Sequence, residues 1–248
     1  MNNHRLNYWS QTKQRASDSY FSEQILRSKY STIAFFNFLK KNNCLNCKIV
    51  DLACGNGANL IYLAKKFNIK KKLLGIDINK YLIKKAINYS NRYNNLKFEI
   101  GNILNLKKKY KNKYDGFISL QTLSWLEDYE KAIIQMVRLN PKFICVSSLF
   151  WEDQIDFKIK LNKLKNDSYK RSVKSYEFYN IYSLKNYINF LKKKGYKKNI
   201  AMKFNIPKII KQKNKIKMGT YTIKDGKQLI QLSGPIKMNW YFILSKKK

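Results

Sequence analysis

The stretch from Lys48 to Leu60 limits most strongly what this chain can fold into. It opens with an apolar run over residues 49–53, makes a tight turn that contains Gly55 and Gly57, and continues into a segment with helical apolar spacing. Glycine tolerates left-handed backbone conformations and lets the backbone approach a ligand where a Cβ atom would clash. A strand, a glycine turn and a helix in this order are typical of a nucleotide-binding unit.

Strand and helix signals alternate through most of the chain. Ser183 and Gly195 are expected to start and end the last predicted helix, as an N-cap and a C-terminal stop. Alternation of this kind predicts an α/β fold with a seven-stranded, mostly parallel, doubly wound sheet that is covered on both faces. The predicted strands cover residues 49–53, 72–78, 96–100, 114–120, 143–149, 200–206 and 240–244.

Two regions depart from this alternation. Residues 1–46 carry apolar side chains at roughly helical spacing, and we expect a helical segment that either packs on the sheet or forms a lid over the site. Residues 151–180 mix aromatic and charged side chains, and we expect an insertion on the substrate side after strand five. Both the insertion and a hairpin at Asp225-Gly226 would belong to a main domain of residues 47–248.

The composition bounds the class of protein. The 248 residues carry a net charge of +36, but only 6 of the 51 basic residues are Arg. We interpret the Lys excess mainly as AT-rich coding, because a dedicated nucleic-acid binder would be richer in Arg. No apolar run approaches a membrane span, no secretory signal is visible and the four Cys suit a reducing compartment, so we expect a soluble cytoplasmic protein.

Polar residues follow three of the predicted strands. Asp51 lies in the first strand, Asp77 ends the second, and Asn102 follows the third. These strand ends meet at the carboxyl edge of a parallel sheet, where ligands bind. An acid at the second strand accepts hydrogen bonds from ribose hydroxyls in such folds. An acid before the glycine turn suits a ligand with an ammonium group better than a pyrophosphate.

The turn resembles motif I of the class I, Rossmann-like S-adenosylmethionine-dependent methyltransferases, and the resemblance extends over residues 47–149. It implies that Asp51 lies near the methionine ammonium and that Asp77 holds the ribose hydroxyls. It also implies that Gly55 and Gly57 let the backbone pass close to the donor. Ala53 departs from the family, which often has glycine at that position.

The same resemblance assigns the remaining donor contacts. Ile78 would pack on the adenine face, with Ile103 beside the ring. Asn102 would meet the adenine amino group, although Asp is commoner there, and its side-chain carbonyl can still accept that hydrogen bond. Leu120 and Gln121 would form the floor under the methionine end.

The acceptor site is less explicit, and we assign no catalytic residue and no metal ligand. His4, the only histidine, is expected to be an ordinary surface residue, and Cys44-x-x-Cys47 lacks a second metal-ligating pair. The candidate substrate contacts are Tyr8, Trp9, Tyr20, Trp125 and Trp151, and the candidate acids are Glu127, Asp128, Glu152 and Asp153.

Three functions remain open. The leading hypothesis is methyl transfer to oxygen or nitrogen of a small molecule, for example a sugar, a lipid headgroup or another metabolite. The alternative is a tRNA or rRNA methyltransferase, which predicts one continuous lysine face beside the site. The third is a non-catalytic protein that binds the cofactor as a scaffold.

Overall fold

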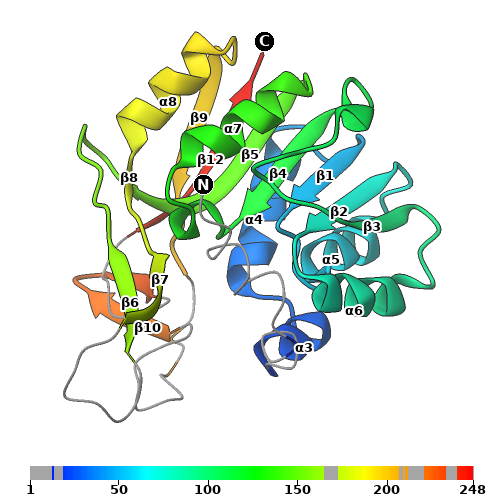
Figure 1. Cartoon of the computed structure of the whole chain (residues 1–248), viewed down its shortest axis with the longest axis horizontal. Helices are drawn as coiled ribbons and strands as arrows, with labels where there is room; N and C mark the ends of the chain where they lie inside the picture. The colour runs from blue at the N-terminus through cyan, green and yellow to red at the C-terminus, as the bar shows by residue number, and fades with distance from the viewer. Residues whose placement is uncertain are drawn as a thin grey trace.

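The main sheet has the strand order β3-β2-β1-β4-β5-β12-β9, and β8 pairs with β5 beside this path. The computed structural model describes residues 13, 19–164, 173–206, 209, 211, 221–232 and 239–247. Strands β1 to β5 run parallel, whereas β12 is antiparallel to both of its neighbours (Figure 1). The bounds are β1 Ile49–Leu52, β2 Leu73–Asp77, β3 Leu96–Ile100, β4 Gly116–Leu120, β5 Phe143–Trp151, β8 Tyr182–Ser183, β9 Lys198–Lys203 and β12 Trp240–Lys246.

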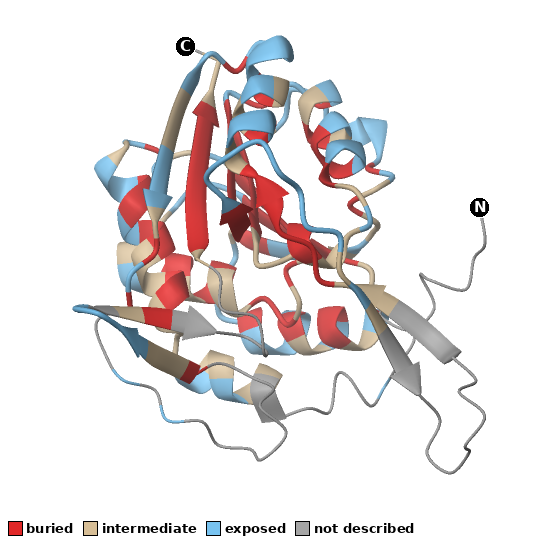
Figure 2. Ribbon diagram, turned by 90° about the vertical axis from the view of Figure 1, so that its left-hand side faces the viewer, coloured by how far each residue is buried: buried red, intermediate tan, exposed pale blue. Residues whose placement is uncertain are grey.

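This arrangement confirms the predicted seven-stranded, mostly parallel α/β sheet. Helices cover both of its faces (Figure 2). Side chains from α4, α5 and α6 belong to one buried cluster, and side chains from α7 and α8 belong to the other. The bounds are α4 Tyr30–Lys41, α5 Ala58–Phe67, α6 Lys80–Ser90, α7 Tyr129–Arg138 and α8 Leu184–Lys193, with shorter helices α3 Ser19–Leu26, η1 Lys108–Tyr110 and η2 Leu123–Trp125.

The central strands divide their side chains between these two clusters. Ile49 belongs to the first cluster and Val50 to the second, and Ile118 and Phe117 divide in the same way. Successive side chains of a strand point to opposite faces, so an entirely apolar strand needs cover on both sides. Each fully buried apolar side chain contributes about 1.5–3 kcal/mol, which makes this double cover the main stabilising feature of the sheet.

Local caps set the start and end of α8 as the sequence predicts. The Ser183 side chain accepts a hydrogen bond from the backbone N–H of Asn186 at 3.1 Å. Gly195, just past the helix, has a left-handed φ of 91°. The same N-cap chemistry starts α6 at Asn79 and α7 at Asp128.

Two hairpins lie outside the main sheet, beyond its carboxyl edge (Figures 1 and 2). The hairpin predicted at Asp225-Gly226 is present as β10 (Tyr221–Asp225) and β11 (Gln228–Leu232). The insertion contains a second hairpin, β6 (Lys160–Leu164) and β7 (Val173–Phe178), which the sequence analysis did not predict. Strand preference depends strongly on neighbours, and the Lys- and Asn-rich β6 carries little intrinsic signal.

None of the helices in the described ranges is long and apolar enough to cross a lipid bilayer.

Candidate functional site

The glycine turn bends the chain sharply between β1 and α5. Ala53, Gly55 and Gly57 all have left-handed φ angles, of 59°, 57° and 79°. The N–H of Gly57 donates to the carbonyl of Cys54 at 3.0 Å, and Gly57 is also the N-cap position of α5. Ala53 holds its left-handed conformation with a Cβ atom present, which costs about 1–2 kcal/mol for an L-residue.

The two glycines are required by different neighbours. A Cβ atom on Gly57 would lie 2.6 Å from the Phe98 ring, so the close packing of β3 against the turn excludes a side chain there. A Cβ atom on Gly55 would lie 3.2 Å from the Phe21 ring, which comes from α3. Helix α3 therefore lies directly against the turn, and the backbone carbonyl of Phe21 accepts a hydrogen bond from the Asn56 side chain.

Asp77 connects the turn to the end of β2. One of its carboxylate oxygens accepts from the N–H of Gly55 at 2.8 Å, and the other accepts from the N–H of Asn79 at 2.8 Å. These bonds orient the carboxylate at the carboxyl edge of the sheet. Each carboxylate oxygen can accept more than one hydrogen bond.

Asp51 is a buried acid at the same edge. It is 1% exposed, and neither carboxylate oxygen has a hydrogen-bond partner among the residues that the structure describes. Burial raises the pKa of Asp51 to about 8, and the Asn59 side chain beside it opposes part of this increase. A buried, unpaired carboxyl of this kind is costly unless a ligand supplies its partner.

Helix α4 contacts this edge through two side-chain hydrogen bonds. Thr32 Oγ1 donates to Asn59 Oδ1 at 2.9 Å, and Gln121 Nε2 donates to Ser31 Oγ at 3.5 Å. Gln121, directly after β4, has a left-handed φ of 57° and donates its backbone N–H to Ser147. The sequence analysis singled out Gln121 but missed Ser31, Thr32 and Asn59, because no local motif marks contacts across 27 and 90 positions.

The residues expected around the adenine lie at the end of β3. The Asn102 side-chain oxygen accepts from the N–H of Leu104 at 2.8 Å and so closes a local turn. Ile103 is buried in the second cluster, whereas Ile78 and Leu120 are partly exposed. Asn102 thus has a clear structural role, and its role towards a ligand stays a prediction.

Trp125 and Tyr179 form an aromatic pair after β4, with ring centroids 4.7 Å apart. Trp125 ends η2 and is partly exposed, whereas Tyr179 follows β7 and is buried. The pair therefore joins the loop after β4 to the base of the insertion hairpin. Trp125 was a predicted substrate contact, but Tyr179 was only one of many aromatic residues in the insertion.

Asn180, next to Tyr179, is completely buried and binds several backbone groups. Its side chain donates to the carbonyl of Leu126 at 2.9 Å and accepts from the N–H of Ile159 at 2.9 Å. Its own N–H donates to the carbonyl of Ser124 at 2.7 Å. Asn180 thus ties the loop that carries Trp125 to both strands at the hairpin base.

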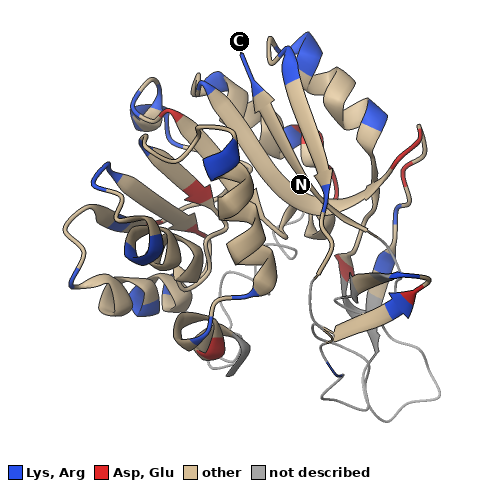
Figure 3. Ribbon diagram, turned by 180° about the vertical axis from the view of Figure 1, so that it is seen from behind, with Lys and Arg blue, Asp and Glu red and all other residues tan. Residues whose placement is uncertain are grey.

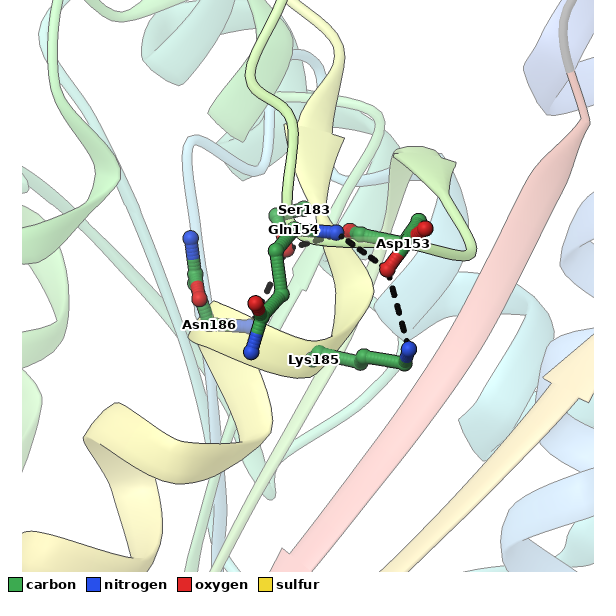
Figure 4. A network of polar contacts seen from close by, with 5 residues as sticks. All are labelled: Asp153, Gln154, Ser183, Lys185 and Asn186. Carbon is green, nitrogen blue, oxygen red and sulfur yellow. Dashed lines mark hydrogen bonds and ion pairs between the residues drawn. The ribbon is translucent and has the colours of Figure 1, made fainter.

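The other acidic candidates mostly have structural partners. Asp128 caps α7, and Glu152 accepts from the Tyr241 hydroxyl. Asp153 pairs with Lys185 at 2.9 Å and accepts from the N–H of Gln154, beside the Ser183 cap of α8 (Figure 4).

The aromatic candidates divide between described and undescribed parts of the chain. Trp151 is 41% exposed and meets Phe157 edge-on, with centroids 6.0 Å apart. Tyr8 and Trp9 lie outside the described residues, as does His4. Tyr20 lies in α3, but its side chain is outside the described part.

A family model described as a methyltransferase domain matches residues 45–214, which is more than half of the chain. The chain belongs to the methyltransferase domain family. The predicted family, the enzyme class and S-adenosylmethionine as the methyl donor are thereby confirmed.

Solved methyltransferase-like structures share the fold. The N-terminal domain of EvdMO1, crystallised in the presence of SAH and D-fucose, has a TM-score of 0.58 at 9% identity, with 90% of this chain and 84% of that chain covered. A proposed sarcosine dimethylglycine methyltransferase from Galdieria sulphuraria has a TM-score of 0.53 at 14% identity, covering 88% and 84%. TehB from Haemophilus influenzae has a TM-score of 0.53 at 17% identity, with 87% of this chain and 62% of that chain covered.

The alignment with the longer EvdMO1 structure covers 87% of this methyltransferase and 40% of that chain.

The residues of this methyltransferase fit its donor. When bound, S-adenosylmethionine supplies an electrophilic methyl group on a sulfonium sulfur and carries an α-ammonium group. The orphaned Asp51 carboxyl suits that ammonium group, and Asp77 has hydrogen-bonding capacity towards hydroxyls. At the left-handed turn, Gly55 places no side chain of its own at the same edge.

A surface recess of about 820 Å³ lies on the methyltransferase between α3, α5 and the end of α6. Ile25, Ile61 and Tyr62 line it together with basic residues such as Lys65 and Arg92. The cysteines Cys44, Cys47, Cys54 and Cys145 are free, and no group of three or more metal-ligating side chains occurs within the described ranges.

Proposed function

We propose that this methyltransferase transfers a methyl group to an oxygen or nitrogen of a small molecule, and that a sugar-like ring is the favoured acceptor. The observation that carries the proposal is the partly exposed Trp125 ring after β4, which packs against the buried Tyr179 ring. An aromatic face offers a large apolar surface on which the C–H groups of a ring can pack, while the ring hydroxyls stay free for hydrogen bonds.

The proposed donor contacts follow the carboxyl edge. Asp51 would face the α-ammonium and Asp77 the ribose hydroxyls. The turn at Ala53, Gly55 and Gly57 would pass beneath the donor. Leu120 and Gln121 would lie under its methionine end, and Ile78, Asn102 and Ile103 would surround the adenine.

The proposed acceptor walls come from both sides of that edge. Residues 1–46 would form a helical lid, since α3 and α4 contact the glycine turn and Gln121. The insertion at residues 151–180 would form the opposite wall, with Trp125 at its base and Trp151 farther out. Tyr8, Trp9 and Tyr20 stay proposed lid contacts. These walls would hold the acceptor lone pair in line with the methyl group, which is the main source of acceleration in such a displacement.

Two features support a small acceptor in the cytoplasm. EvdMO1 was crystallised with a sugar, D-fucose, and the Galdieria protein is named for methylated amino acids. All four cysteines are free, as suits a reducing compartment.

The charge distribution weakens the RNA alternative. Lys and Arg occur on α5, α6, α8 and β9, on both sides of the sheet (Figure 3). An RNA methyltransferase would be expected to gather them on one face beside the site. Within the described residues, the spread agrees better with AT-rich coding.

The test has two steps. Calorimetry with SAH first measures donor binding. If SAH does not bind, the whole proposal is contradicted. Purified protein is then incubated with S-adenosylmethionine labelled in the methyl group and with separated small-molecule and RNA fractions of an extract. Label in the small-molecule fraction is the expected result, and label in RNA alone would establish the alternative. Donor binding without any transfer would favour the scaffold hypothesis.

A further inference from the structure

The surface recess between α3, α5 and the end of α6 has one face of α5 as its floor. The floor residues are spaced three or four positions apart along that helix, as neighbours on one helix face are: Ala58, Ile61, Tyr62, Lys65 and Lys66. The apolar members come first, and the two lysines lie in the last turn. The floor is therefore a stripe about 12 Å long that is apolar at one end and basic at the other.

The two walls of the recess come from α3 and from the end of α6 (Figure 1). Ile25 and Leu26 belong to the α3 wall, and the Leu26 side chain is 87% exposed. Tyr89, which is 38% exposed, belongs to the α6 wall. A groove between helices with apolar walls suits the apolar face of another helix.

The charged residues that line the recess are all basic. They are Lys65, Lys66 and Arg92, and no Asp or Glu occurs among the described residues that line it. Lys65 and Lys66 are exposed and form no ion pair within the described part of the chain. An apolar groove with unpaired cations at one end is complementary to an apolar surface flanked by acids.

Two other occupants suit the recess less well. A second copy of this chain carries the same net charge of +36, so repulsion opposes its approach to a basic recess. Single-stranded RNA would match the cations, but its bases bind mainly by stacking on aromatic rings. The most exposed apolar side chain of the recess, Leu26, is aliphatic and favours apolar protein side chains.

We propose that this recess binds an acidic amphipathic helix of a partner protein. The apolar face of the partner helix lies on Leu26, Ile61 and Tyr89, and its acids face Lys65 and Lys66. The floor holds about two turns of a helix, so the contact is small and its binding weak and reversible. The interaction is independent of the proposed donor and acceptor sites.

The test measures the fluorescence anisotropy of a labelled helical peptide of about 16 residues, with Leu along one face and Glu on both flanks. Two control peptides replace either every Glu by Lys or every Leu by Gln. The unmodified protein is expected to bind the first peptide at least about tenfold more tightly than either control. Equal binding of the Leu and Gln peptides would show mere attraction to a basic protein and overturn the inference, as would the absence of binding.

Charge variants locate the bound peptide. Lys65→Glu/Lys66→Glu should weaken peptide binding by at least about tenfold, whereas Lys192→Glu/Lys193→Glu should change it by less than about threefold. Both pairs are exposed in the last turn of a helix, so the pairs differ in their position relative to the recess. Equal weakening by the two double variants would contradict binding in the recess.

An apolar variant tests the α3 wall. Leu26→Ser should weaken peptide binding by about fivefold, because the Leu26 side chain no longer becomes buried on binding. Ile134→Ser, at an exposed apolar position of α7, is the control and should leave the affinity unchanged. Equal effects of the two substitutions would remove the α3 wall from the site and overturn the proposed mode of binding.

Sedimentation and RNA binding test the other occupants. The unmodified protein is expected to sediment as a monomer, and a dimer that is lost in Lys65→Glu/Lys66→Glu would assign the recess to a second copy. A labelled oligouridine should bind equally to the unmodified protein and to this double variant. If the double variant instead loses oligouridine binding while the acidic peptide fails to bind, the recess is an RNA site. Either of these results would overturn the inference.

Discussion

The proposed donor side and the proposed acceptor side of the carboxyl edge are built in different ways. On the donor side, backbone turns and strand ends position most of the proposed contact residues, and Asp77 bonds to the N–H of Gly55, 22 residues away. On the acceptor side, Asn180 joins segments that are 54 and 21 positions away. The difference predicts that the donor side tolerates changes in the insertion, whereas the acceptor side depends on a few buried side chains.

The largest expected effect concerns Asp51. In Asp51→Asn, SAH affinity should fall by at least about 100-fold, because the ammonium group loses its buried counter-charge. The ligand-free protein should become more stable at neutral pH. Burial raises the folded-state pKa to about 8 from 3.8, so the stability from this group is present below about pH 4 and is lost as the pH rises through 8.

Thermal unfolding across that range measures the stability effect. The free energy of unfolding of the unmodified protein should decline relative to the variant between pH 4 and 8. Parallel curves would show that Asp51 is not a buried acid of raised pKa.

The acceptor side is tested by Asn180→Leu, which keeps the branched shape of the side chain and removes its hydrogen bonds. The N–H of Ile159 loses its partner and the carbonyl of Leu126 keeps only the Tyr182 hydroxyl, which should cost about 2–4 kcal/mol in the free energy of unfolding. Asn186→Leu, at an exposed position of α8, is the matched control. SAH affinity should stay within about threefold in both variants. A large loss in Asn180→Leu would show that the two sides are coupled.

Packing under the glycine turn is tested by Gly57→Ala. The new Cβ atom would meet Phe98 at 2.6 Å in addition to its unfavourable φ, at a cost of about 2–3 kcal/mol. Gly226→Ala in the β10–β11 turn has a similar φ of 58° but nothing within 4 Å, so it should cost about 1 kcal/mol. Chemical denaturation measures both. Equal losses would show that Phe98 moves aside and that the donor side is less rigid than proposed.

The pH dependence of donor binding follows from the same Asp51 carboxyl. The ligand-free group is mostly protonated below pH 8, and facing an ammonium group requires the ionised form. SAH affinity should therefore rise by up to about tenfold per pH unit as the pH approaches 8, with release of a proton on binding. Calorimetry in buffers of different ionisation enthalpy measures the number of protons released on binding. The Asp51→Asn variant should show neither effect.

The smallest expected effect is a gain in stability. Ala53→Gly removes the strain of the left-handed φ of 59°. Because glycine also gives the unfolded chain more freedom, the net gain in the free energy of unfolding should be about 0.5 kcal/mol. Ala64→Gly in α5 should instead destabilise by about 1 kcal/mol, since that residue is helical. Denaturation midpoints compare the two. A loss of stability in Ala53→Gly would show that the Ala53 methyl group makes a contact worth more than the strain.

Much of the sheet could be predicted from the sequence, because its apolar runs and turn residues are local features. The strands around Val50 and Ile118 were found within two residues of their observed ends. Hairpin β6–β7 and strand β8 were missed. Their residues gain strand structure only by pairing with distant partners, as Tyr182 of β8 does with Phe150 of β5.

The sequence by itself determined the doubly wound sheet, the turn from Asp51 to Gly57 and the placement of Asp77 at the same edge. These features arise from backbone sterics and hydrophobic period, which act over a few residues. Only the tertiary structure shows that the Phe98 ring leaves no room for a side chain at Gly57. It also shows that Ser31 and Thr32 contact the carboxyl edge, and that Asn180 forms hydrogen bonds to the loop that carries Trp125. Such contacts depend on how whole strands and helices pack, and no residue spacing along the chain encodes them.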